Sequence, residues 1–552
     1  MAAISALQVQ RSLIIVEFLL MMAGFIVLLP RKSAGRSPFP PWFYNLARKK
    51  KVAVLLTGLL VLGSRSVLIP ILGVPRPQWH DEFSYLLAAD TFAHGRLTNP
   101  TPPEWQHFET FHVILEPTYM SIYPPAQGLV LAAGQVLGHP WIGQLLITAA
   151  MCSAICWMLQ GWLPPAWALL GGFLAVLRLG ILSYWTNGFW SASVVAFAGA
   201  LLVGALPRLK RRPTVSDTLW MAAGIMILAN SRPYEGLVLS IAAAGYLVHW
   251  LLSPKRPNSA LIMRRLIVPA LIALAAGAIG TGYYYHRVTG NAFRMTYEVD
   301  QKQYASVPFF LFQSLQPEHA YRHEILRTFY ENDRRSFEDL QTGTGFLRQS
   351  AMRFANWWNF YFGPLLTIPL LALPWMVRNR RVRFALLTLA CMLVALSVST
   401  WFLPHYFAPA TALLYLVLVQ GLRHISHVPY GSNVVRWVLL VACSMVLLRI
   451  IAVVAHAPLE PRWPRGNLQR ANLVSELNRL PGAQIVIVRY SDSHDPVEEW
   501  VYNSADLPGA KIVWARDMGT RGNNELLARF SDRQAWIVQP DASPVLLQPY
   551  RP

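Results

Sequence analysis

Charged residues are scarce in this chain. Asp, Glu, Lys and Arg make up 14% of its 552 residues, whereas hydrophobic residues make up 54%. A water-soluble protein of this length could not bury that much apolar surface. Acidic residues are the scarcest charged class, 28 against 48 Lys and Arg, which gives a formal net charge of +20. The basic residues stand in short clusters between apolar runs, a pattern typical of membrane topology signals and not of a nucleic-acid-binding surface.

Cysteine is also rare. The four cysteines, Cys152, Cys156, Cys391 and Cys443, all lie inside apolar runs. This placement indicates neither a disulfide framework nor a zinc site. The first apolar run is long, few basic residues precede it and a basic loop follows it. We therefore interpret it as a membrane helix and not as a cleavable signal.

Long apolar runs, in contrast, are abundant. Runs of roughly 17–25 residues, the length that crosses a bilayer, recur through the first 455 residues or so. The sequence therefore predicts an all-α polytopic membrane protein with about twelve transmembrane helices. The predicted spans are 12–30, 52–72, 141–162, 165–184, 188–206, 217–231, 234–252, 266–285, 362–377, 384–401, 405–422 and 435–454.

The basic clusters predict the topology. An even number of predicted helices separates each cluster from the next, so all of them can face the cytoplasm, as basic loops prefer to do. The remaining junctions then face outward, and two of them are long: a first outer loop at 73–140 and a second at 286–361. The basic clusters are at 31–51, 208–212, 255–265 and 378–383.

The last hundred residues have a different pattern. We divide the chain into a transmembrane domain, 1–455, and an extracytoplasmic tail domain, 456–552. The tail contains the β-branched runs "QIVIVRY", "AKIVWAR" and "AWIVQP", and the run "NNELLARF" has helix-like composition. This alternation predicts a small α/β domain. The segment "YSDSHDPVEEW" is interpreted as a solvated loop.

Adjacent carboxylates open the first outer loop. "PQWHDEFSYLL" places Asp81 and Glu82 just beyond the second predicted helix, and Phe83 and Leu87 then follow at helical spacing. We expect this helix to lie on the bilayer surface. A second juxtamembrane helix follows Tyr123, where a Pro pair suits the first turn. Local chemistry alone leaves open that the two acids only cap their helix.

Other outer junctions also hold ionisable side chains at membrane depth, where such groups usually mark function. Under the predicted topology they lie on the same side as Asp81, which suits an anionic, lipid-linked substrate. These residues are Arg232, Tyr234 and Glu235 in "NSRPYEG", His286 and Arg287 in "YYYHRVTGN", and His405 and Tyr406 in "WFLPHYFAP".

This set of motifs resembles a known family. Asp81, Glu82, Tyr85 and Gly95, followed by "SIYPPAQGL", are similar to the first outer loop of GT-C membrane glycosyltransferases. The resemblance spans roughly residues 75–420. It is strongest to the family 39 group, which includes protein O-mannosyltransferases and the lipid A aminoarabinose transferase. The family's Lys before the Pro pair is absent here, because Tyr123 stands in its place.

The resemblance implies a function. A sugar carried on a polyprenyl phosphate would be transferred to an acceptor hydroxyl on a lipid, glycan or protein, at the extracytoplasmic face of the inner membrane. Asp81 would act as general base and Glu82 would orient the reactants, with inversion of the anomeric carbon. Arg232, Arg287 or His405 would stabilise the departing phosphate. The other expected substrate-binding residues are His80, Tyr85, Tyr123, Tyr234, Glu235, His286 and Tyr406.

Metal dependence and two rival functions stay open at this stage. His80, Asp81 and Glu82 are metal-competent, so a divalent cation is compatible with the site, but their adjacency is not a ligand spacing. A lipid or solute transporter would also hold charges at membrane depth, although no inverted repeat is visible in the sequence. The third alternative is a non-catalytic membrane scaffold that displays the tail.

Overall fold

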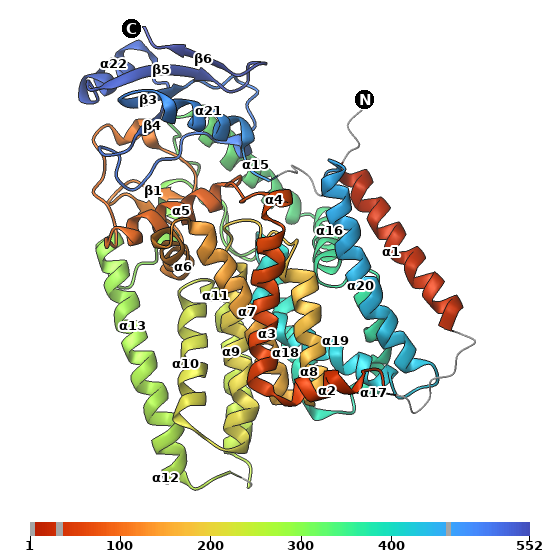
Figure 1. The fold of residues 1–552 in the computed structure, drawn as a ribbon. Helices are drawn as coiled ribbons and strands as arrows, with labels where there is room; N and C mark the ends of the chain where they lie inside the picture. The colour runs from red at the N-terminus through yellow and green to blue at the C-terminus, as the bar shows by residue number, and fades with distance from the viewer. Residues whose placement is uncertain (1–5, 29–36, 255, 460–464, 552) are drawn as a thin grey trace.

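The computed structural model describes residues 6–28, 37–254, 256–459 and 465–551. Arg31, Lys32, Arg36 and Lys255 of the predicted basic junctions lie outside these ranges. The described chain forms a long helical bundle with a small sheet-containing domain at one end (Figure 1).

Helical segments occupy all the predicted spans. Seven helices of the described residues are long and apolar enough to cross a membrane, and shorter apolar helices accompany them. The prediction of an all-α polytopic bundle is therefore confirmed. The segments are α1 (Ala6–Leu28), α3 (Lys50–Val67) with α4 (Ile69–Leu72), α7 (Pro140–Trp162), α8 (Pro165–Ala175) with η2 (Val176–Gly180), α9 (Ala192–Arg211), α10 (Val215–Ala229), α11 (Pro233–Leu251), α12 (Ser259–Ile262) with η3 (Met263–Ile267) and α13 (Val268–Thr289), η4 (Leu365–Ala372) with α17 (Leu373–Met376), α18 (Arg380–Ser397), η5 (Pro404–Ala410) with α19 (Thr411–Ile425), and α20 (Gly431–Val454).

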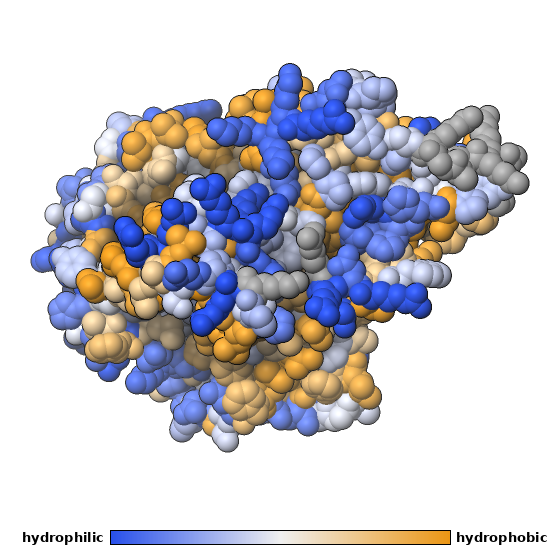
Figure 2. Space-filling view, turned by 90° about the horizontal axis from the view of Figure 1, so that it is seen from below, coloured by the Kyte–Doolittle hydropathy of each residue, from blue (hydrophilic) through white to orange (hydrophobic). Residues whose placement is uncertain are grey.

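The two ends of the bundle differ in character. The short helices α2 (Pro41–Arg48), α12 and α17, which adjoin basic junctions, all lie at the lower end in Figure 1, α12 apart from the other two, and the tail lies at the upper end. Seen from below, the lower end shows hydrophilic side chains among apolar ones (Figure 2). The described parts of the basic junctions thus share the end opposite the tail, as the predicted topology requires.

The outer loops fold into a layer between the bundle and the tail. The first loop supplies two helices and a two-stranded hairpin, and the second supplies three helices. The elements are α5 (His80–Ala93), η1 (Trp105–Phe108), β1 (Val113–Ile114), β2 (Met120–Ser121) and α6 (Pro125–Val136), then α14 (Thr296–Gln303), α15 (Glu324–Leu340) and α16 (Gly343–Tyr361).

Helix α5 is buried on both faces, so the expectation that it lies on the bilayer surface was wrong. Tyr85 and Ala88 belong to the core of the bundle, whereas Phe83 and Leu87 belong to a second core shared with the tail. The Phe83 ring stacks on Tyr502 with centroids 4.2 Å apart. The same apolar face that would suit a membrane surface is covered by protein instead, which the local pattern could not distinguish.

The tail is a four-stranded sheet accompanied by two helices. The strand order is β4-β3-β5-β6, with β3 parallel to both neighbours and β6 antiparallel to β5. The three predicted strands and the predicted helix are confirmed, whereas α21 and β6 were not predicted. The elements are α21 (Leu468–Arg479), β3 (Ala483–Val488), η6 (Pro496–Glu498), β4 (Ile512–Arg516), α22 (Gly519–Arg529), β5 (Arg533–Gln539) and β6 (Leu546–Pro549).

Buried polar contacts join the tail to the first outer loop. Within the tail, Arg516 forms an ion pair with Glu499 at 2.7 Å, and both side chains are almost fully buried. Arg516 Nε also donates to the Glu109 carbonyl, and His107 Nδ1 donates to the Arg516 carbonyl at 2.9 Å. A buried pair is stable only when each charge keeps its partners. Glu499 and Trp500 are thus core residues, so the interpretation of their segment as a solvated loop fits its exposed part around Asp492 but was wrong for its C-terminal end.

We predict that Phe83→Ala loosens the tail from the bundle. Truncating a buried aromatic ring costs about 3–5 kcal/mol, and the ring removed here joins the two parts of the molecule. Limited proteolysis of the detergent-solubilised protein should release a C-terminal fragment faster than in the wild type. Phe293→Ala is the matched control, because that ring is 95% exposed. Equal cleavage rates for the two variants would contradict the prediction.

Candidate active site

Asp81 lies in the first turn of α5, facing the loop layer. Its side chain is 22% exposed, so the carboxylate can be reached from outside. The Tyr123 hydroxyl donates a hydrogen bond to Asp81 Oδ1, and His112 Nδ1 lies 3.9 Å from the same oxygen. Tyr123 and His112 are themselves 3.4 Å apart. The three side chains form a compact polar group that holds one carboxylate oxygen and leaves the other available.

His112 reaches Asp81 because its backbone takes an uncommon conformation. Its φ is 59°, in the left-handed region that non-glycine residues visit rarely. Two hydrogen bonds to the His112 carbonyl stabilise this conformation, one from Ser84 Oγ at 2.6 Å and one from the Ile122 amide at 3.3 Å. Backbone strain of this kind clusters at functional sites. No local motif marks His112 in the sequence, so it was not predicted.

Glu82 has a different environment from Asp81, its neighbour in sequence. It is 3% exposed, and its carboxylate accepts hydrogen bonds from the amides of Gln78 at 2.9 Å, Trp79 at 3.2 Å and Phe189 at 2.8 Å. Burial raises the pKa of Glu82, and these three amides oppose that shift. The side chain thus joins the start of α5 to the segment before α9.

Tyrosine rings line the group on the side of the bundle. Tyr85 stacks on Tyr123 with centroids 4.3 Å apart, and Tyr297 meets Tyr123 edge-on at 5.7 Å. The Tyr85 hydroxyl donates to Ser191 Oγ at 3.2 Å. Burial raises the pKa of Tyr85, and burial together with Asp81 raises the pKa of Tyr123. Both hydroxyls therefore stay protonated and act as hydrogen-bond donors.

Arg232 supplies a cation beside this wall. It is 8% exposed, its guanidinium lies 4.1 Å from the Tyr406 ring centroid, and its Nη1 is 3.8 Å from Glu235 Oε1. Tyr85 interacts electrostatically with both Arg232 and Asp81. Arg232 Nε has no hydrogen-bond partner within the part of the chain that the structure describes. The predicted residues Arg232, Glu235 and Tyr406 are therefore brought together, close to Tyr85.

His405 adjoins the same group from η5. It is 2% exposed, its ring packs 4.7 Å from the Trp190 ring and 5.0 Å from the Tyr406 ring, and its Nδ1 lies 3.1 Å from the Tyr184 hydroxyl.

His80 points away from the group around Asp81, toward the tail. Its Nε2 donates to the Pro496 carbonyl of the tail at 2.8 Å, and burial lowers its pKa to about 4.

Three predicted residues lie apart from the group. His286 and Arg287 are exposed on α13, where Arg287 Nη1 donates to the Tyr283 hydroxyl at 3.3 Å. Tyr234 donates to the Ala395 carbonyl at 2.8 Å and packs on Phe310. A helix places neighbouring residues on different faces, so membrane depth alone did not show which of them point to the site.

Two carboxylates of the second outer loop approach the site without any sequence signal. Asp300 on α14 and Asp333 on α15 both interact electrostatically with His112. Burial raises the pKa of each to about 6, although the His112 charge opposes the shift. These residues are distant from Asp81 in sequence, and only the fold brings them near.

The described residues offer no ready metal site. None of them form a group of three or more His, Cys, Asp or Glu side chains that could hold a metal ion. One Asp81 oxygen is engaged by Tyr123, and the Glu82 oxygens by backbone amides. These donor sets do not fit a divalent cation, and no step is assigned to one.

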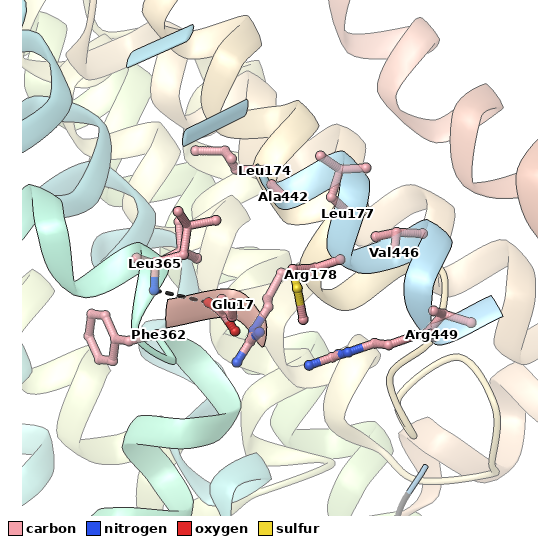
Figure 3. A pocket seen from close by; sticks show the side chains of 12 residues that line it. Glu17, Leu174, Leu177, Arg178, Phe362, Leu365, Ala442, Val446 and Arg449 are labelled. Atoms are coloured by element: carbon pink, nitrogen blue, oxygen red, sulfur yellow. Dashed lines mark hydrogen bonds between the residues drawn. The ribbon is translucent and has the colours of Figure 1, made fainter. Parts of the chain in front are cut away.

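A separate cavity with an empty volume of about 470 Å³ lies inside the bundle between α1, η2, η4 and α20 (Figure 3). Glu17, Arg178 and Arg449 project into it among apolar side chains. Glu17 Oε1 accepts the Leu365 amide at 2.9 Å, and Arg178 Nε donates to the Phe360 carbonyl at 2.8 Å. These contacts satisfy backbone groups at the junction of α16 and η4. The sequence did carry this signal, as charges inside predicted spans.

The helical bundle, the structured first outer loop and the small α/β tail form the GT-C glycosyltransferase fold. Among solved structures of this fold, ArnT from Cupriavidus metallidurans bound to undecaprenyl phosphate is 12% identical, with a TM-score of 0.50, 87% of this chain covered and 92% of that one. The Archaeoglobus fulgidus oligosaccharyltransferase in complex with zinc and sulfate is 13% identical, with a TM-score of 0.49 and coverages of 88% and 67%. No protein-family model and no curated protein sequence matches the chain.

The likeness to ArnT shows the fold. At 12% identity it carries over no residue roles, so the GT-C architecture expected from the motifs is confirmed while the roles of Asp81 and Arg232 stay predictions. A shared fold does not by itself define a reaction.

We predict that Glu82→Gln and Asp81→Asn differ in stability. The Gln amide turns an N–H₂ group toward backbone N–H donors and should cost about 1–3 kcal/mol, the penalty for unsatisfied buried groups. In Asp81→Asn the new amide oxygen can still accept the Tyr123 hydrogen bond, so this variant should leave the melting temperature nearly unchanged. Thermal unfolding in detergent measures both. A melting temperature for Glu82→Gln equal to that of the wild type would contradict the positioning role.

The raised pKa of Asp300 leads us to predict that the stability of the folded protein depends on pH. Its folded-state pKa of about 6 exceeds the ordinary 3.8, so the folded protein holds this proton more tightly than the unfolded chain does. Stability therefore falls as pH rises from about 4 to 6 and stays lower above pH 6, by at most about 3 kcal/mol. Asp300→Asn should raise the melting temperature more at pH 7.5 than at pH 4.5. Asp532→Asn, at an exposed turn, is the control, and a pH-independent difference for Asp300→Asn would refute the prediction.

Proposed function

We propose that this protein is a membrane glycosyltransferase that moves a sugar from a polyprenyl-phosphate carrier to an acceptor hydroxyl. The observation that carries the proposal is the arrangement of Asp81 and Arg232. An accessible carboxylate, Asp81, is held by Tyr123 and His112, and Tyr85 interacts electrostatically both with this carboxylate and with the buried cation Arg232. The GT-C fold supports it, and ArnT, a solved structure of that fold, binds undecaprenyl phosphate.

Asp81 is the proposed general base. An acceptor hydroxyl is a weak nucleophile until its proton is removed in the transition state. Tyr123 fixes one Asp81 oxygen, and the other can take that proton as the acceptor oxygen bonds to the anomeric carbon. The bond from that carbon to the phosphate oxygen breaks, and the configuration inverts. A covalent glycosyl-enzyme would need a second free carboxylate, and the Glu82 oxygens are already engaged.

Arg232 is the proposed partner of the phosphate. The polyprenyl phosphate leaves as an anion, and a preorganised cation stabilises the charge that develops there. Arg232 is buried beside Tyr85, whereas Arg287 is exposed on α13. The geometry therefore favours Arg232 over Arg287 in place of the Lys that is absent before the Pro pair. His405 adjoins Tyr406 and can help position this end of the donor.

The remaining assignments follow the same geometry. Glu82 is proposed as a positioning residue and not as a reacting group, because backbone amides engage it. His80 is proposed to support the tail above the site, because it donates to Pro496. The tail and α5, whose first turn carries Asp81, lie at the same end of the bundle (Figure 1). We propose that this is the extracytoplasmic end, in the inner membrane of the cell.

The test is transfer of labelled sugar. Purified protein in nanodiscs receives a radiolabelled polyprenyl-phosphate hexose or pentose and a cell-envelope extract as the acceptor source. We expect Asp81→Asn to reduce transfer by about 10²–10⁴-fold, the usual contribution of a general base, without loss of folded protein. Arg232→Gln should lower donor use, and Asp532→Asn should match the wild type.

The outcomes separate the rival functions. Asp81→Asn with near-normal transfer would return Asp81 to a helix-capping role. Movement of the intact donor across the membrane of vesicles that contain the protein, with no sugar transferred, would favour a transporter. Neither movement nor transfer would favour a scaffold.

A further inference from the structure

A second cleft lies between the tail and the second outer loop. Its empty volume is about 710 Å³, part of it open to solvent. Glu324 and Thr328 of α15 line one wall, and Arg489, His494 and Arg516 of the tail line the other. None of these residues belongs to the group around Asp81, and the cleft has no role in the proposed chemistry so far.

The tail residues that line the cleft lie at the carboxyl ends of parallel strands, where α/β sheets commonly bind ligands. Arg489 follows directly after β3, and Arg516 ends the parallel strand β4. Strand β3 connects to β4 on one side, whereas β5 connects to β6 on the other. In open α/β sheets, ligands bind outside the carboxyl ends of the strands, where the connections diverge in this way. The cleft lies outside the carboxyl ends of β3 and β4, on the β3 side of that point.

Two buried nitrogens in this wall lack partners. Arg516 Nη1 and His494 Nε2 have no hydrogen-bond partner among the described residues, although their side chains are only 3% and 5% exposed. A buried polar atom left unsatisfied costs about 1–3 kcal/mol. Both residues line the cleft, so a polar ligand there could satisfy both nitrogens.

The charges of the cleft argue against a simple anion site. Each basic group in the wall is already paired with a carboxylate: Arg489 with Asp517, Arg516 with Glu499, and His494 with Asp541 at 2.6 Å. The N-terminus of α22, which could otherwise attract phosphate, is occupied, because the Gly519 amide donates to Asp517 Oδ1 at 3.1 Å.

What remains in the cleft is a mixture of donors and acceptors. Arg516 and His494 offer guanidinium and ring nitrogens, and the exposed carboxylates of Asp492 and Glu324 accept hydrogen bonds. A hydroxyl both donates and accepts, so a ligand with many hydroxyls matches both kinds of group. This is the chemistry of a carbohydrate.

We propose that this cleft is a subsite for a saccharide portion of the acceptor. The proposal rests on the proposed glycosyltransferase function. Its position suits that role, because Tyr490 of the cleft packs against the cluster containing Phe111, and Phe111 stacks on His80 at 4.4 Å. His80 directly precedes Asp81. The cleft is thus connected to the proposed base by a continuous path of packed side chains, from Tyr490 through Phe111 to His80.

The experiment measures binding by the full-length protein in nanodiscs, without donor. Saturation-transfer difference NMR is recorded with neutral hexose tetrasaccharides and with uronic-acid-containing tetrasaccharides as probes. We expect saturation transfer to at least one probe in the wild type and its loss in Thr328→Trp, whose ring fills the cleft. Ser336→Trp is the matched control, since it adds the same ring to an exposed position of α15 and should bind like the wild type.

A second variant tests whether binding can be lost without misfolding. Asp492→Ala removes an exposed acceptor and should weaken binding at least threefold while the melting temperature stays unchanged. No saturation transfer to any probe, equal transfer in the wild type and Thr328→Trp, or displacement of the saccharide by millimolar inorganic phosphate would each overturn the proposal. These outcomes are independent of Asp81→Asn transfer rates, so failure of the subsite and failure of the proposed reaction are distinguishable.

Discussion

The carboxylate of Glu82 is the contact on which the rest of the outer layer depends. A buried charge is tolerated only when its hydrogen-bonding capacity is met. Here the amides of Gln78 and Trp79, at the start of α5, and of Phe189, before α9, converge on one side chain. This anchor fixes the position and direction of α5 relative to the bundle. Asp81, one residue earlier, is thereby held in place while only one of its own oxygens is engaged, by Tyr123.

The tail also holds α5 in place, from the side opposite the bundle. Phe83 and Leu87 on the outer face of α5 are buried by the tail together with the rest of the first outer loop. Arg516, held by its pair with Glu499 within the tail, joins the tail to the loop layer by donating to the Glu109 carbonyl. A shift of the tail would leave this buried donor and acceptor unsatisfied, which disfavours other docking positions. These contacts therefore favour a single docking position of the tail above the site.

The spans and the tail strands could be predicted because both depend on local periodicity, as in the apolar run of α7 or the β-branched run of β3. The environment of α5 could not, because an apolar helix face looks the same whether lipid or protein covers it. His112 and Asp300 carried no motif and approach Asp81 only through tertiary folding. Arg287 was expected at the site and lies on an exposed face, since a one-residue difference changes the side of a helix.

Asp81 and Glu82 are adjacent in sequence but have different environments: Glu82 makes structural contacts, and Asp81 is accessible. Both are acids in the first turn of the same helix, where the helix dipole favours negative charge. Glu82 faces inward to backbone amides and is 3% exposed, whereas the Asp81 side chain is 22% exposed and has a hydroxyl and an imidazole beside one oxygen. A base must be rigid enough to hold its geometry and open enough to meet its substrate. Rigidity comes here from one residue and access from the other, so the pair is needed even though only Asp81 would react.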